Sequence, residues 1–210
     1  YSCIPVEFIL QNGLPLPLFI HRDDIEYGLR ASGNFIFLNG VCVWHEAFEN
    51  KLPGFLEYYD VRNLAIVNAI HNPSFTARDF KKMLLIQVSS NVGKYRYKYV
   101  DLNLKGAVDF LKGFRWFCCL DAARLHRNLA KYNYQTEEVE NFVGYKGIEK
   151  GDLKVTEEAE NIPGTLEKIW KIVTLNGHFF PGKRNCIKIV RPNPNIYELY
   201  RFKEVLFIDT

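Results

Sequence analysis

Apolar positions recur at helical spacing over most of the chain beyond residue 55. This periodicity predicts helices over residues 55–70, 75–88, 100–117, 122–132 and 166–175. Pro73 follows the first of these helices and marks its limit. Short apolar runs predict two late strands, at residues 187–190 and 204–208. The pattern therefore predicts a mainly helical second part of the chain.

The first 50 residues have a different pattern, in which short apolar runs alternate with turns. Residues 5–10 predict a short helix, and residues 14–20, stiffened by two prolines, predict a buried strand or a strand-like coil. Two further apolar runs flank Asn39-Gly40, a pair typical of a hairpin turn, although parallel insertion into a larger sheet is the alternative. We expect an α+β fold that divides near Pro73, into residues 1–73 and 74–210.

Two adjacent carboxylates begin the next predicted helix. Ile25 and Leu29 recur at helical spacing, and Glu26 can pair with a residue four positions later, Arg30. Asp23 or Asp24 is then the N-cap or the residue just after it. One interpretation is that both acids only stabilise the helix N-terminus. The other is that one of them projects into a cleft as a general base, held by a rigid corner.

Composition and charge narrow the classes of function. With 27 basic against 24 acidic residues, no overall field favours nucleic acid or an anionic membrane. Five cysteines without metal-ligand spacing favour a reducing compartment, and no run is long and apolar enough for a membrane span. Residues 137–160 contain eight acids and three lysines, which predicts a solvated excursion. The basic and aromatic stretch at residues 94–99 lacks a known nucleic-acid-binding module, so we expect no nucleic-acid partner.

Several blocks, in this order, resemble one enzyme family. GLPLPLFIHRDDIEYGLR, VCVWHE and YYDVRN are similar to the second half of the catalytic domain of family-two glycosyltransferases, and most similar to the galactofuranosyltransferase-like branch. Residues 95–97, 109–113 and 175–178 also resemble its C-terminal region. The resemblance implies that residues 1–73 are the acceptor-side part of a GT-A-like α/β domain. Residues 74–210 would then be a helical domain with a few late strands.

The resemblance also implies a chemistry for the paired acids. Asp24 takes the place of the family's general base, which deprotonates an acceptor hydroxyl as it attacks the donor sugar with inversion. Asp23 would cap the helix and orient the acceptor, and Glu26 would face the cleft. His45 takes the place of a ligand for a divalent metal, Mn or Mg, although by itself it also reads as a hydrogen-bonded structural residue.

Three further residues are expected to contact acceptor or donor: Trp44, Arg62 and Asn63. Arg62 could bind a phosphate in a bidentate manner, or form a surface ion pair with Glu57. Asp60 stands where some galactofuranosyl enzymes have a histidine, so the donor sugar is open between galactofuranose, our best interpretation, and rhamnose.

One departure from the family concerns the metal and the nucleotide. The sequence contains no Asp-x-Asp motif and no glycine-rich phosphate loop. We therefore expect this chain to be a piece of a longer enzyme, inactive alone and without a bound cofactor. Its partners would be a nucleotide sugar and a glycan or lipid-linked glycan, at the cytoplasmic face of the membrane, with a peripheral membrane contact or self-association. The alternative class is a non-catalytic module for oligomerisation or membrane contact.

Overall fold

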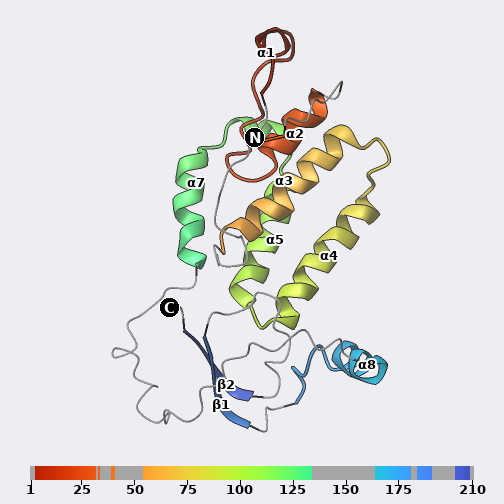
Figure 1. Cartoon of the computed structure of the whole chain (residues 1–210), viewed down its shortest axis with the longest axis vertical. Helices are drawn as coiled ribbons and strands as arrows, with labels where there is room; N and C mark the ends of the chain where they lie inside the picture. The colour runs from red at the N-terminus through yellow and green to blue at the C-terminus, as the bar shows by residue number, and fades with distance from the viewer. Residues whose placement is uncertain are drawn as a thin grey trace. The chain divides into compact units, whose positions relative to one another are not determined.

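The computed structural model describes residues 3–31, 33, 39–40, 54–133 and 164–180, and the backbone of residues 184–190 and 202–208. These residues are mostly helical (Figure 1). The helices are α1 Val6–Asn12, α2 Asp23–Arg30, α3 Leu56–His71, α4 Ala77–Gly93, α5 Tyr97–Leu111, α6 Gly113–Cys118, α7 Ala122–Leu129 and α8 Thr165–Val173, with a 3-10 turn, η2, at Ala130–Tyr132. The strands β1 Arg184–Val190 and β2 Phe202–Ile208 pair in parallel, with Arg184 opposite Phe202 and Val190 opposite Ile208.

The contacts divide the chain into two compact units. The first unit comprises Tyr1–Glu46, Pro53–Ser89 and Tyr97–Asn133, and the second comprises Ala47–Leu52, Ser90–Arg96 and Tyr134–Thr210. Helices from both sides of Pro73 thus belong to the first unit. This division by contacts does not follow the boundary near residue 73 that the sequence pattern predicts.

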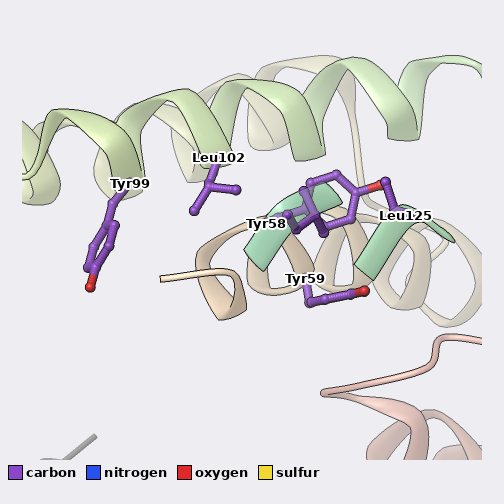
Figure 2. Packing of buried hydrophobic residues seen from close by; sticks show 6 residues of the cluster. Tyr58, Tyr59, Tyr99, Leu102 and Leu125 are labelled. Atoms are coloured by element: carbon purple, nitrogen blue, oxygen red, sulfur yellow. The ribbon is translucent and has the colours of Figure 1, made fainter. Parts of the chain in front are cut away.

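Helix α3 is the centre of the first unit. It is buried on several sides, because apolar and aromatic residues occur all around it rather than in one stripe. Figure 2 shows Tyr58 and Tyr59 of α3 packed with Tyr99 and Leu102 of α5 and Leu125 of α7. A second cluster joins α3 to α4 and α5; it contains Val61, Ala65, Phe80 and Ala107. The segment before α2 packs on these helices through Leu18, which clusters with Val67 of α3 and Phe117 of α6.

Two local features fix the helices around α3. The start of α4 is a capping box, in which the Asp79 carboxylate accepts from the backbone N–H of Thr76 at 2.9 Å and the Thr76 hydroxyl accepts from that of Asp79 at 3.3 Å. At the crossing of α3 and α5, a Cβ on Gly106 would lie 2.5 Å from the Tyr58 carbonyl oxygen. A glycine is therefore needed for the two helices to approach this closely.

The predicted helices are present, with shifted ends. The predicted helix over 100–117 is two helices, α5 and α6, because Gly113, the first residue of α6, has a left-handed φ of 81°. Residues 14–20 contain no strand: Leu18 is buried, whereas Leu14 is exposed. The flanks of the predicted hairpin lie outside the described residues, although Asn39 and Gly40 form a turn in which Gly40 has φ 86°.

Candidate functional site

A strained corner precedes the paired acids. Phe19, His21 and Arg22 all have positive φ, of 76°, 64° and 73°. Left-handed backbone is uncommon for residues other than glycine and costs roughly 1–3 kcal/mol at each position, so it persists only where surrounding contacts impose it. Helix α2 begins at the next residue, Asp23. The corner thus sets the direction in which α2 leaves the preceding segment.

Asp23 and Asp24 occupy the first turn of α2, and both are exposed. Asp23 directly follows the N-cap position, which Arg22 occupies without a side-chain cap hydrogen bond. The Asp24 carboxylate accepts the backbone N–H of Ile25 at 2.8 Å, and this is a bond within its own helix. An exposed carboxylate oriented by one backbone amide, at the positive end of a helix, is available to an external group.

Glu26, predicted to face the cleft, is instead fully buried. Its two carboxylate oxygens accept from Arg30 at 2.8 Å and from the ring of His71 at 3.1 Å. The predicted Glu26–Arg30 pair is confirmed. Because His71 is the last residue of α3, this cluster ties α2 to the end of α3. Direct contact between Glu26 and a substrate would require these bonds to be exchanged.

Arg62 and Asn63 are also buried, with 1% and 0% of their surface exposed. Arg62 Nη2 donates to the carbonyl of Leu18 at 2.9 Å, and Asn63 Nδ2 donates to those of Ile20 and His21 at 2.7 and 2.8 Å. The alternative of a surface ion pair between Arg62 and Glu57 is wrong, because the Arg62 guanidinium points into the interior. Arg62 Nη2 and Asn63 Nδ2 thus bond to the backbone of the corner.

A second set of bonds reaches the same corner from outside. The Asp60 carboxylate, one turn before Asn63 on α3, lies 2.9 Å from His21 Nδ1 and 3.3 Å from Arg22 Nη2. These side chains are between a quarter and a third exposed, so solvent weakens their electrostatic attraction. Asp60 therefore contributes geometry to the corner more than stability.

Arg62 belongs to a buried polar network that extends to α5. Its Nη1 contacts the Tyr58 hydroxyl at 3.3 Å, and that hydroxyl donates to the Asp109 carboxylate at 2.8 Å. Burial raises the pKa of Tyr58 well above its ordinary value, so the phenol keeps its proton and can donate. Burial by itself would raise the pKa of Asp109, but hydrogen bonds from Lys112 and Tyr58 outweigh it and hold that pKa below 3.8.

The predicted metal ligand, His45, and the neighbouring Trp44 lie outside the described residues. Within the part of the chain that the structure describes, no three His, Cys, Asp or Glu residues lie together in a way that could hold a metal ion. A donor set for Mn or Mg is therefore not assembled from these described residues.

In the same part of the chain, none of the helices has the length and apolar character needed to cross a membrane.

Two blocks that are far apart in the sequence, at residues 93–95 and 176–178, are in contact in the second unit. The Tyr95 hydroxyl donates to the Asn176 carbonyl at 2.7 Å, and its ring stacks on His178 with centroids 4.2 Å apart. Asn176 Nδ2 donates to the Gly93 carbonyl at 2.7 Å. Residues 95–97 and 175–178 both resembled the same family region, but nothing in their spacing indicated a mutual contact.

Two known proteins are similar to part of the chain. A stretch of 121 residues, 54% of the chain, is 32% identical to galactofuranosyltransferase GlfT2 of Mycobacterium tuberculosis strain H37Rv. The chain is related to glycosyltransferases. A stretch of 73 residues, 32% of the chain, is 40% identical to galactofuranosyltransferase GlfT2 of Mycolicibacterium smegmatis. These matches cover 19% and 11% of the two relatives, so the chain spans about a fifth of their length or less.

No protein-family model matches the chain. No solved structure matches it significantly either. The relationship to glycosyltransferases therefore rests on the two GlfT2 proteins, and the fold is described from this chain alone.

Proposed function

We propose that the chain is the acceptor-side part of an inverting glycosyltransferase. It would transfer a sugar, galactofuranose as the first choice and rhamnose as the alternative, from a nucleotide-sugar donor to a glycan or a lipid-linked glycan. The similarity to two galactofuranosyltransferases supports the reaction class. The observation that carries the assignment of residues is the exposed carboxylate pair on a corner fixed by buried side chains of α3. We place the complete enzyme at the cytoplasmic face of the membrane.

Asp24 is the general base of this proposal. A sugar hydroxyl is a poor nucleophile, and a positioned carboxylate that removes its proton contributes about 10²–10⁴-fold. Asp24 has the required exposure, and its one backbone bond, to Ile25, orients the carboxylate without burying it. Asp23, beside it in the first turn, orients the acceptor. Glu26 connects α2 to the end of α3 through its bonds to Arg30 and His71.

A divalent metal, Mn or Mg, belongs to the complete enzyme in this proposal. His45 would be one ligand, and the remaining ligands would come from the nucleotide-binding part. When bound, such an ion neutralises the charge that builds on the departing diphosphate. Trp44 would contact acceptor or donor from the same segment.

The test is Asp24→Asn in the complete protein, measured as transfer to the acceptor. Transfer should fall by about 10²–10⁴-fold, because the amide cannot take up the hydroxyl proton. Asp101→Asn changes an exposed acid on α5 in the same way and should leave transfer unchanged. Thermal unfolding of both variants serves as the control for folding. Undiminished transfer by folded Asp24→Asn protein would leave the acids only a role at the helix N-terminus.

The second candidate is a module for oligomerisation or peripheral membrane contact. The observation that favours it is the exposed apolar surface of α8, where Leu166, Ile172 and Val173 are 84%, 74% and 70% exposed. In that case Leu166→Ser with Ile172→Ser would reduce self-association in sedimentation experiments, or sedimentation with vesicles of anionic lipid. The glycosyltransferase proposal predicts that the same double variant keeps its transfer activity in detergent-free assays with a soluble acceptor.

A further inference from the structure

The corner before α2 presents its carbonyl groups inward, to one pair of side chains. The carbonyls of Leu18, Ile20 and His21 all accept hydrogen bonds from Arg62 or Asn63. In a strand these groups would bond to a neighbouring strand, and in a helix to amides further along the chain. Here two consecutive residues of α3, about 40 positions later, satisfy them.

The donor side chains are themselves held in one orientation. Arg62 Nε donates to Asn63 Oδ1 at 2.9 Å, so the Asn63 amide must turn its Nδ2 toward the corner carbonyls. The Arg62 guanidinium lies over the rings of Tyr58, Tyr59 and Phe117, at 5.1, 5.1 and 5.5 Å from their centroids. Burial and ring contacts leave neither side chain free to adopt another rotamer without losing several bonds.

The backbone that these donors hold would not keep its conformation by itself. Three residues between positions 19 and 22 have left-handed φ, and none of them is glycine. Such strain is retained where surrounding contacts determine it completely, and it recurs at sites where geometry matters for function. The first backbone bond of α2, from the Glu26 N–H to the Arg22 carbonyl at 2.8 Å, starts from this strained segment.

We infer that Arg62 and Asn63 are positioning residues, which hold the corner at residues 18–22 and thereby set where the Asp24 carboxylate stands. This inference rests on the proposed function for the role of Asp24, but not for the corner itself. Neither side chain touches a substrate in this assignment. Their effect is on the distance between the base and the hydroxyl, where a displacement of about 1 Å can cost about 10²-fold in rate.

The first experiment tests whether Asn63 holds the corner. Asn63→Asp in the complete protein replaces the Nδ2 donor with an oxygen that faces three carbonyl oxygens at 2.7–3.3 Å. Asn68→Asp is the matched control, because the Asn68 amide bonds only to the Leu64 carbonyl of its own helix in the described contacts. Hydrogen exchange is followed by mass spectrometry in peptides that cover residues 14–30.

The expected result is local. Exchange of the α2 amides that make backbone bonds, beginning with Glu26, should rise at least about tenfold in Asn63→Asp, the factor that corresponds to losing one or two ordinary hydrogen bonds. Exchange in α5 should stay unchanged, and Asn68→Asp should resemble the wild-type protein throughout. Unchanged exchange in residues 14–30 of a folded Asn63→Asp protein would overturn the inference. If Asn63→Asp does not fold, Arg62→Lys replaces it, because lysine keeps the charge but loses the fixed geometry of the Arg62 donors.

The second experiment separates positioning from plain stability. Transfer by the Asn63→Asp protein is measured below its unfolding temperature. Its kcat should be about 10- to 100-fold lower than that of the wild-type protein, while KM for the donor changes little, because only the base is displaced. Arg62→Lys should show the same pattern to a smaller extent. A loss of kcat in Asp24→Asn together with wild-type kcat in Asn63→Asp would overturn the positioning role. Retention of transfer in Asp24→Asn would instead contradict the proposed function, while the exchange result still decides whether Asn63 holds the corner.

Discussion

The Asp109 carboxylate is buried near the end of α5, where it faces Lys105, Lys112 and the Tyr58 hydroxyl. Lys112 Nζ lies 2.6 Å and Lys105 Nζ 3.4 Å from its oxygens. Because these contacts hold the folded-state pKa of Asp109 below 3.8, the ionised form stabilises the folded chain. This stabilisation is complete at pH values above the ordinary pKa of an aspartic acid, and it is lost as the pH falls through the lowered pKa of Asp109 in the folded chain.

Asp109→Asn should therefore reduce the free energy of unfolding near neutral pH by about 1–3 kcal/mol, as a buried hydrogen-bonded charge is removed. Urea unfolding monitored by circular dichroism measures this difference. The gap from the wild-type protein should narrow as the pH falls below the ordinary carboxyl pKa, and it should be smallest below the lowered pKa of Asp109, where the wild-type carboxylate also becomes neutral. Asp101→Asn, at an exposed position of the same helix, is the control. A gap that stays constant as the pH is lowered would contradict the prediction.

At single residues, contacts between neighbours in the sequence could be predicted, whereas the burial and orientation of a side chain could not. The pairing of Glu26 with Arg30 follows from their spacing of four and is confirmed. The burial of Glu26 could not be predicted, because it depends on His71, which lies 45 positions later. The inward orientation of Arg62 depends likewise on the Leu18 carbonyl, 44 positions earlier. A polar residue in a helix is read as exposed unless its distant partner is known.

At the scale of elements, α3 and α5 approach closely through Gly106. A Cβ there would lie 2.5 Å from the Tyr58 carbonyl oxygen and 3.4 Å from the Arg62 backbone nitrogen. In α2, by contrast, a Cβ on Gly28 would meet nothing within 4 Å. The same substitution should thus have opposite effects in two helices of one unit.

Gly106→Ala should lower the free energy of unfolding by about 1–3 kcal/mol, because the helices must separate or strain, and this exceeds the gain of about 1 kcal/mol in helix propensity. Gly28→Ala should raise it by about 0.5–1 kcal/mol, because only the propensity term operates. Thermal unfolding of the two variants provides the comparison. Equal stabilisation by both would mean that α3 and α5 do not cross at Gly106 as described.

Periodicity predicts the end of a helix well where a proline limits it, as at the end of α3 before Pro73. The break between α5 and α6 was not predicted, because the apolar pattern continues across Gly113, whose positive φ starts a new helix. The segment at residues 14–20 was harder, because its apolar residues and prolines suit a strand as well as a coil. The segment is a coil because side chains of α3, rather than a neighbouring strand, donate hydrogen bonds to its carbonyl groups. Such long-range hydrogen bonds leave no periodic signal in a sequence.

At the scale of the whole molecule, the two units contribute differently to the proposed function. The paired acids, the strained corner and its donors all belong to the first unit. The contact of Tyr95 with Asn176 and His178 belongs to the second. Asp23 and Asp24 therefore need only the first unit for their local geometry. In the proposed function, the rest of the enzyme would supply the nucleotide-sugar donor and the metal.

The chain of 210 residues by itself should not hold the donor side of the reaction. Titration with Mn²⁺ and with uridine diphosphate, followed by isothermal calorimetry, should give no binding at micromolar concentrations. The physical reason is that a diphosphate held through a metal needs several convergent carboxylate or imidazole ligands, and the sequence has no Asp-x-Asp pair to join His45. A complete galactofuranosyltransferase of the same kind serves as the positive control. Micromolar dissociation constants for both ligands would mean that these residues already form a donor site, and that the division of labour proposed for the enzyme is wrong.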